Sequence, residues 1–345
     1  MDIIVAQMSQ TLVLSESSAK SHRLPARVLD PVSLAEDFAT FQANTKSANT
    51  RKNYEVQWRQ FEEWCQVNGF RAGPCDHGTL STYIRQLYRD GKSLSTLNVV
   101  LAAIRAQHIA AGLDDPTAAP AFKEFMSGVR RTMAQKGLTE RHVAKTISLD
   151  QLRTLAQACS DDLEGMRNRA LILVGFGGWF RRSELLSIHY EQLAFEAGRI
   201  LVTLHRSKTN QAGQRTERIE LTEIVGEYAD LCPYSAIRQW LDASGIIGGP
   251  VFRKIYQGTL TDSALTSGSW FWRLLDKLGK DAGIPFHIAP HRTLRASPIT
   301  LAVLSGQPMP VVMKRARHAS AETTTRYFDE AAAGQAEVNR AVYKS

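Results

Sequence analysis

Helical hydrophobic patterns follow one another through the first 135 residues, and they restrict the fold of this part more than any other feature. Asn49-Thr50 is typical of a helix start. The apolar residues that follow recur at i, i+4, i+7 and i+11, as Tyr54, Trp58, Phe61 and Cys65. Similar patterns predict helices over about residues 77–90, 94–112 and 119–135. We therefore expect an all-helical domain at residues 31–135, preceded by a flexible arm at residues 1–30.

A polar, basic segment, residues 136–147, is interpreted as a linker to a second domain at residues 148–345. Ser148 and Gln151 have the spacing of a helix capping box, and an apolar run at residues 164–177 predicts a buried helix. Strands are expected at residues 192–196, 199–205 and 216–221, with a hairpin tip at 208–214. Apart from a short apolar segment at 250–252, the remainder is expected to be helical. The fold class is therefore mainly α with a small antiparallel β-sheet, in two domains.

Composition excludes several classes of protein. No stretch approaches about 18 consecutive apolar residues, and the first residues lack the pattern of a signal peptide. We therefore expect a cytoplasmic protein. The four cysteines, Cys65, Cys75, Cys159 and Cys232, are widely spaced and form no CxxC pair. They are interpreted as reduced, mostly buried thiols, with no disulfide framework and no metal site.

The net charge of +8 and the pI of about 9.4 favour a polyanionic partner, although a soluble protein can also simply be basic. Several cations are expected to point outward from helices or to lie in the linker. These candidate phosphate contacts are Arg51, Lys52, Arg59, Arg130, Arg131, Arg141 and Lys145. If both domains bind one polyanion, the linker has to cross it.

Two separated arginines, a lysine, a histidine and a late tyrosine suggest a phosphate clamp with a nucleophile aimed at it. These candidates are Arg181, Arg295, Lys208, His318 and Tyr327. Two guanidinium groups from distant segments commonly bind a phosphate and neutralise developing charge. Each residue also has an ordinary interpretation: a surface arginine paired with a nearby glutamate, a solvated lysine at a hairpin tip, or a packed aromatic ring.

The order and spacing of these residues resemble those of the tyrosine recombinases, the phage integrase family, which includes Cre-like and Xer-like enzymes. The family motif Gly-x-x-Arg-x-Ser/Gly-Glu-Leu matches residues 178–185, and it selects Arg181 rather than Arg182 as the first catalytic arginine. The family lysine corresponds to Lys208, and Glu184 falls where an acidic residue supports the active site. The closing motif matches the run from His318 through Ser320 to Tyr327, which ends in Thr-Thr-Thr-Arg-Tyr.

The resemblance implies a mechanism as well as a fold. Residues 31–135 correspond to a core-binding (SAM-like) domain, and residues 148–345 to a catalytic domain of a C-shaped DNA clamp. Tyr327 would form a 3′-phosphotyrosyl link while Lys208 protonates the leaving 5′-oxygen. No metal or other cofactor would be needed. Partners would be double-stranded DNA with inverted-repeat sites and three further copies of the chain, with nucleoid association and a docking helix at residues 329–345.

Three positions depart from the family pattern. The second motif usually reads His-x-x-Arg, but counting back from Arg295 places Arg292 at the histidine position, with His291 one residue earlier. Arg292 has the expected spacing, whereas the His291 imidazole could accept a proton, so both stay open. Arg317 replaces the glycine that usually precedes His318, and Pro298 replaces an aromatic residue.

Other functions are also consistent with parts of this residue pattern. A type IB topoisomerase or a telomere resolvase would use the same chemistry and differ in its product. A DNA-binding protein of recombinase descent with weakened catalysis would keep the fold, and the altered second motif is the feature that favours it.

Overall fold

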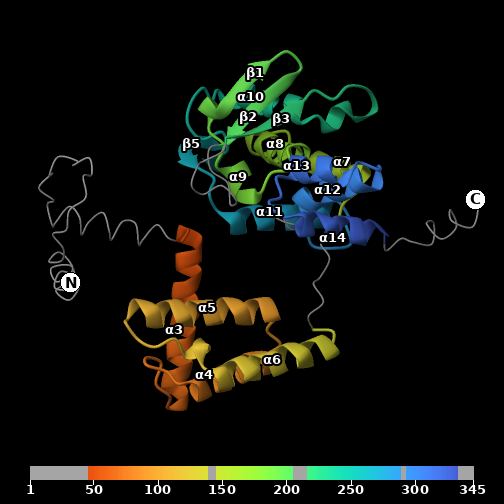
Figure 1. The fold of residues 1–345 in the computed structure, drawn as a ribbon. Helices are drawn as coiled ribbons and strands as arrows, with labels where there is room; N and C mark the ends of the chain where they lie inside the picture. The colour runs from red at the N-terminus through yellow and green to blue at the C-terminus, as the bar shows by residue number, and fades with distance from the viewer. Residues whose placement is uncertain (1–45, 139–144, 205–215, 289–292, 333–345) are drawn as a thin grey trace, which may run out of the picture. The chain divides into compact units, whose positions relative to one another are not determined.

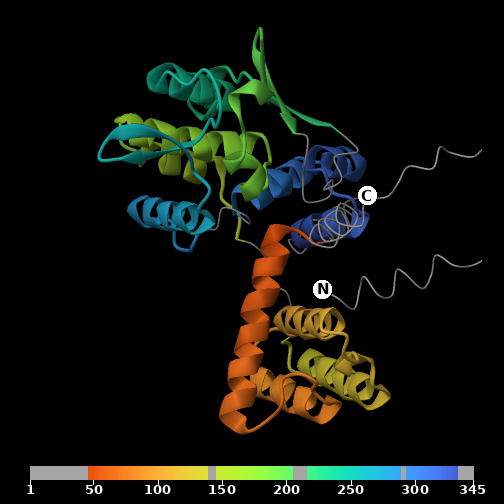
Figure 2. The same ribbon diagram turned by 90° about the vertical axis from the view of Figure 1, so that its left-hand side faces the viewer.

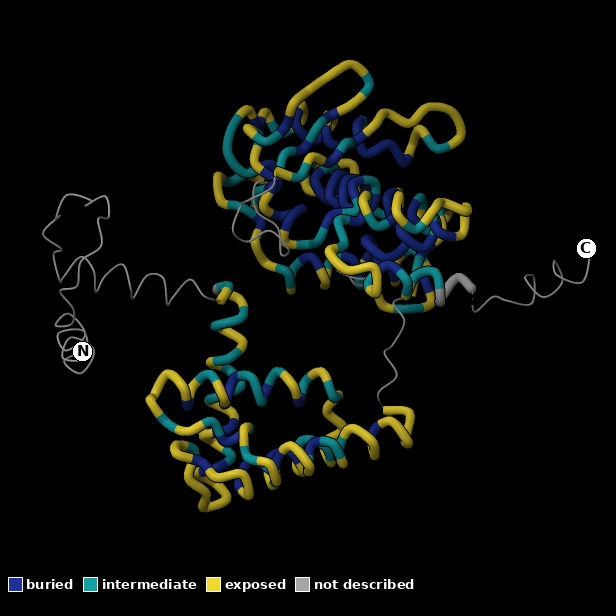
Figure 3. The backbone as a smooth tube through the Cα atoms, viewed as in Figure 1, coloured by how far each residue is buried: buried dark blue, intermediate teal, exposed yellow. Residues whose placement is uncertain are grey.

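The computed structural model describes residues 46–138, 145–204, 216–288 and 293–332. Contacts divide the chain into two compact units, Met1–Arg141 and His142–Ser345. Each unit has its own set of elements (Figure 1) and its own buried core (Figure 3). Among the described helices, none has the length and apolarity needed to cross a membrane. The described chain is mainly helical with small antiparallel sheets, as expected from the sequence.

The first unit is built from helices alone in its described part: α3 (Ala48–Asn68), α4 (His77–Arg89), α5 (Leu94–Ala110), η1 (Pro116–Ala118) and α6 (Pro120–Gln135). Ser47 caps α3 by accepting a hydrogen bond from the Thr50 amide, and Gly69 ends it in the left-handed conformation. Phe61 and Cys65 of the predicted stripe are buried in this core. The four helices predicted here are confirmed within about two residues at their ends.

The second unit is centred on α8 (Leu163–Gly177), which packs along α10 (Pro233–Ser244). Nearly every α8 side chain from Ala170 to Phe176 is buried, because other elements cover it on all sides (Figure 3). The preceding helix, α7 (Leu149–Gln157), begins with the predicted capping box of Ser148 and Gln151. All four cysteines of the chain are free and buried, in agreement with the sequence interpretation.

The three predicted strands form one antiparallel sheet in the order β1-β2-β3: β1 (Leu193–Glu196), β2 (Arg199–Leu204) and β3 (Glu217–Thr222). The expectation that the later chain is otherwise helical is wrong. A second hairpin, β4 (Arg253–Tyr256) and β5 (Thr259–Ala264), precedes α11 (Gly268–Asp281). Its strands are short and polar, with charged and hydroxyl residues on both faces, so they lack the alternation of a half-buried strand.

Three further helices close the described chain: α12 (Thr293–Leu304), α13 (Met309–Ala316) and α14 (Ala321–Ala332). They lie together in both ribbon views (Figures 1 and 2). Ile299, Val303, Val312 and Ala316 form their small core, and Trp179 and Tyr327 pack against it. This cluster anchors the segment that carries Tyr327 to the loop that follows α8.

Candidate active site

The loop after α8 presents Arg181 through a tightly packed turn. A Cβ atom added to Gly178 would lie 2.2 Å from Cε2 of Phe180, so only glycine fits there. Trp179 adopts a left-handed φ of 52°, an uncommon conformation for a bulky residue. Arg181 then stands as the N-cap of α9 (Arg182–Leu186). We call residues 177–181 the arginine loop.

Arg181 and Glu184 are paired, as the ordinary interpretation proposed, but Glu184 is buried and Arg181 is only 16% exposed. Glu184 Oε1 accepts from Arg181 Nη1 at 2.6 Å, and Glu184 Oε2 accepts from the Arg181 amide at 2.9 Å. Glu184 is only 3% exposed. Burial by itself raises the pKa of Glu184, but the charges of Arg317 and Arg181 outweigh it and lower that pKa. Glu184 is therefore an anion that orients Arg181.

Arg295 approaches from α12, and its guanidinium donates to the backbone carbonyls of Trp179 and Ala316. It is 7% exposed, and burial together with the neighbouring charges of Arg181 and Arg317 lowers its pKa to about 10. The guanidinium still carries its charge at neutral pH. The structure thus brings Arg181 and Arg295, which are 114 residues apart in the chain, into one buried positive site.

His318 and Tyr327 lie beside these arginines. Their rings are nearly parallel, with centroids 5.9 Å apart. His318 Nδ1 is 2.9 Å from the buried Thr324 hydroxyl. Burial and the charges of Arg295, Arg181 and Arg317 lower the pKa of His318 to about 4. Its imidazole is therefore neutral at pH 7 and can donate one hydrogen bond while it accepts another.

Four predicted catalytic residues therefore converge: Arg181, Arg295, His318 and Tyr327. Such a site favours a phosphate, because two guanidinium groups can neutralise its oxygens and a phenol lies within the same cluster. Glu184 lies beside them, where it accepts hydrogen bonds from Arg181 and Arg317, and its supporting role in catalysis stays a prediction.

Three of the predicted catalytic residues lie outside the described residues. They are Lys208, which falls between β2 and β3, and His291 and Arg292, which directly precede α12. The spacing argument for the second motif therefore stays a prediction, and so does the assignment of Lys208.

The candidate DNA contacts are distributed over both units. Lys52 and Arg59 are exposed on α3, and Arg130 and Arg131 are exposed on α6, whereas Arg51 is partly buried. The exposed Lys145 lies with its Nζ 5.5 Å from the centre of the Phe286 ring, and Arg141 is outside the described residues.

Residues that the sequence did not mark also enter the site. Arg317 was noted only as a departure from a family glycine, yet its Nη2 donates to Glu184 Oε2 at 2.8 Å. Arg315, Glu217 and Thr324 contact the same group of segments. Sequence alone offered one signal, because a bulky cation at a position that usually holds glycine suggests a specific contact.

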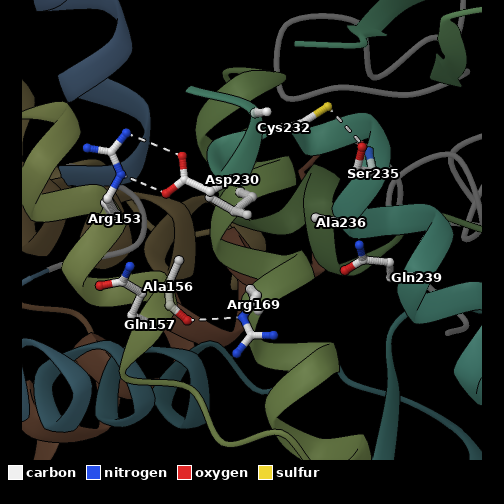
Figure 4. A pocket seen from close by; sticks show the side chains of 11 residues that line it. Arg153, Ala156, Gln157, Arg169, Asp230, Cys232, Ser235, Ala236 and Gln239 are labelled. Carbon is white, nitrogen blue, oxygen red and sulfur yellow. Dashed lines mark hydrogen bonds and ion pairs between the residues drawn. The ribbon is translucent and has the colours of Figure 1, made fainter. Parts of the chain in front are cut away.

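A separate polar pocket lies between α7, α8, η3 (Gly226–Leu231) and α10 (Figure 4). Arg153 Nε donates to Asp230 Oδ2 at 2.6 Å, and Arg169 Nε donates to the Ala156 carbonyl at 3.1 Å. Cys232 Sγ accepts from the Ser235 amide at 3.4 Å. These groups fasten the surrounding elements to one another, so the pocket has a structural explanation.

Comparison with known proteins places this site in a family. The model described as the phage integrase family matches residues 145–333, and the model of the phage integrase N-terminal SAM-like domain matches residues 36–111. The chain belongs to the phage integrase family of tyrosine recombinases. The match to the first model contains every predicted catalytic residue from Arg181 to Tyr327.

Relatives and solved structures agree with this placement. An integrase/recombinase xerD homolog from Selenomonas ruminantium is 31% identical over 290 residues, which cover 83% of each chain. The XerH site-specific recombinase bound to a palindromic difH substrate has a TM-score of 0.58 at 15% identity, over 85% of this chain and 80% of that one. The Tn1549 transposon integrase in complex with transposon right end DNA has a TM-score of 0.57 at 17% identity, over 89% and 98%. The two structural likenesses establish the shared fold.

Proposed function

We propose that this protein is a site-specific DNA recombinase that cuts and rejoins strands through a 3′-phosphotyrosyl intermediate on Tyr327. The observation that carries the proposal is the cluster of Arg181, Arg295, His318 and Tyr327. Within it, the ring centroids of His318 and Tyr327 are 5.9 Å apart. Within a tyrosine recombinase, a phenol beside one buried and one half-buried guanidinium group is suited to attack a DNA phosphate.

The chemistry balances without a metal or an external energy source. Tyr327 Oη gives up its proton, to His291 or, if Arg292 fills the second-motif position, to solvent water. It then forms a bond to phosphorus as the bond from phosphorus to the 5′-oxygen breaks, and Lys208 supplies the proton to that oxygen. Arg181 and Arg295 hold the non-bridging oxygens, and the neutral His318 donates a hydrogen bond to one of them. The phosphotyrosyl bond conserves the energy of the phosphodiester, so a 5′-hydroxyl can reverse the reaction on either strand.

The second motif offers two residues for one task. His291 could accept the Tyr327 proton at neutral pH, whereas Arg292 could only stabilise charge because a guanidinium stays protonated. The three-residue spacing to Arg295 favours Arg292. Measuring single-turnover cleavage by His291→Ala and Arg292→Ala across pH distinguishes them: the assignment to Arg292 is lost if only His291→Ala is impaired.

We assign the DNA contacts to the cations exposed on α3 and α6 and to the linker, with residues 31–135 as the core-binding domain. Each neutralised phosphate releases counterions, so six contacts, four on α3 and α6 and two in the linker, predict a slope of about −5.4 for log affinity against log salt. Lys52→Ala or Arg130→Ala should make this slope shallower by about 1 in equilibrium binding experiments. Arg153→Ala is the control because Arg153 is paired with Asp230, and a slope near zero for the wild type would contradict the clamp.

Recombination between two sites requires four active sites, so we further propose a homotetramer on two inverted-repeat sites. The segment at residues 329–345 would dock on a neighbouring copy, and the protein would associate with the nucleoid. Sedimentation of the chain with one and with two DNA sites measures this stoichiometry, and a complex that never exceeds two protomers would exclude the tetramer.

Covalent trapping tests the proposed function. On a suicide substrate, a nick close to the cut site lets the short cleaved fragment diffuse away, so an active enzyme stays attached to the DNA. We expect a protein–DNA adduct that survives denaturant and is released by protease. Specific binding without an adduct would favour the weakened DNA-binding protein. Relaxed circles or hairpin ends as products from uncut DNA would favour a topoisomerase or a telomere resolvase.

A further inference from the structure

The residue at the end of α13 combines an unfavourable backbone with a buried side chain. Arg317 has φ 55° and ψ 46°, the left-handed conformation that glycine adopts freely. An L-residue is disfavoured there, because its Cβ atom comes too close to the following carbonyl oxygen. The Arg317 side chain is nevertheless only 8% exposed. Its contacts therefore have to compensate for both the backbone conformation and the burial of a charge.

Those contacts join two separate elements of the second unit. On the arginine-loop side, Arg317 Nη2 donates to Glu184 Oε2 at 2.8 Å and to the Trp179 carbonyl at 3.2 Å. On the sheet side, Arg317 Nε lies 3.4 Å from Glu217 Oε2. One guanidinium thus contacts both the loop that presents Arg181 and the first residue of β3.

Arg315, two residues earlier, makes the same connection, because its side chain donates to backbone carbonyls of both elements. Its Nη2 donates to the Gly177 carbonyl at 3.2 Å and to the Glu220 carbonyl at 3.0 Å. Its guanidinium also lies 6.0 Å from the centre of the Trp179 ring. Two arginines from one short segment therefore hold β3 against the arginine loop. We call Arg315 and Arg317 the arginine brace.

The position of Glu217 gives this brace a functional consequence. Glu217 pairs with Leu204, the last residue of β2, so it lies at the end of the β2–β3 pair where the connection between the strands begins. We propose that Arg317 is a positioning residue, which holds the start of β3, and with it the connection from β2, in place relative to the loop that carries Arg181. The consequence for catalysis rests on the proposed function of Lys208, which belongs to the connection between the two strands.

A double-mutant cycle tests the brace independently of Lys208. Arg317→Gly removes the guanidinium, and glycine adopts the left-handed backbone conformation freely. Backbone strain therefore cannot explain a loss of cleavage rate in this variant. We expect single-turnover cleavage to slow on the order of 100-fold, because displacements of about 1 Å have such effects, and we expect about 10-fold for Glu217→Gln. The double variant should be no slower than Arg317→Gly, because the contact that Glu217→Gln weakens is already absent in Arg317→Gly. Losses that multiply to about 1,000-fold would overturn the brace.

A second substrate tests whether the brace acts on proton delivery. A 5′-bridging sulfur leaves without a proton, so it should restore Arg317→Gly and Lys208→Ala to within a few-fold of the wild type. Rescue of Lys208→Ala alone would overturn the role of Arg317 in placing the hairpin. If neither variant is rescued, the assignment of Lys208 as the acid fails, and the cycle still decides whether the brace exists.

Two further variants control for charge and folding. Lys314→Ala removes an exposed cation from the same helix and should cleave both substrates at the wild-type rate. Arg317→Asn also tolerates the left-handed backbone, and it replaces Arg317→Gly if that variant lowers the thermal midpoint. A wild-type rate in both Arg317 variants would show that the buried guanidinium has no positioning role.

Discussion

Tyr327→Phe should abolish covalent capture of DNA while specific binding stays nearly unchanged. The substitution removes one oxygen atom from the Tyr327 ring. This ring packs against the small core of α12 and α13 and stacks beside His318. Phenylalanine fills the same volume, so the packing of α14 should be retained. Without the phenol there is no nucleophile to bond to phosphorus, and trapping on the suicide substrate should fall below detection.

The matched control removes a phenol elsewhere in the same unit. Tyr256 on β4 is 68% exposed, and Tyr256→Phe should trap DNA at the wild-type rate. Binding is measured in parallel by electrophoretic mobility shift, and folding by the thermal midpoint. An adduct formed by Tyr327→Phe would identify a different nucleophile and overturn the assignment.

Arg181→Ala should slow single-turnover cleavage by about 1,000-fold, whereas Arg182→Ala should change it little. Removing one preorganised cation from a developing phosphoryl charge typically costs 100-fold to 1,000-fold or more. Glu184 keeps Arg317 as a partner at 2.8 Å when Arg181 is lost, so no unpaired buried carboxylate is created. The fold should therefore survive, and the loss should lie in the chemical step.

Arg182 is a suitable control because it is the next residue in the chain and its guanidinium packs elsewhere. A Cβ atom added to Gly268 at the start of α11 would lie 2.5 Å from Arg182 Cζ. Arg181→Lys keeps the charge but loses the planar fork, so an intermediate rate is expected. If Arg182→Ala were the impaired variant, the family motif would have been aligned one residue out of register.

Local patterns in the sequence were sufficient for most elements of the fold. The stripe through Phe61 and Cys65, the capping box at Ser148 and the apolar run of α8 depend on residues only a few positions apart. Such patterns predict an element without knowledge of its partners. The β4–β5 hairpin was not predicted because its polar strands show no alternation of apolar and polar residues. Only the pairing of the two strands defines them.

Spacing in the chain also determined the list of catalytic candidates, since Arg181, Arg295, His318 and Tyr327 follow a family order that chance rarely reproduces. It could not determine their electrostatic state. His318 is neutral because burial and the charges of Arg295, Arg181 and Arg317 lower its pKa to about 4. Arg317 is its neighbour in the chain, but Arg295 and Arg181 come from distant segments. A pKa depends on distances in space, which linear spacing does not contain.

Arg317 shows most clearly which features the sequence determines and which depend on the tertiary structure. The sequence by itself determined that a cation occupies a position where the family usually has glycine. Only the tertiary structure decided that this cation is buried between Glu184 and Glu217, two residues 33 positions apart in the chain. The physical reason is that a buried charge is tolerated only where opposite charges and carbonyl oxygens surround it, and folding alone assembles that set.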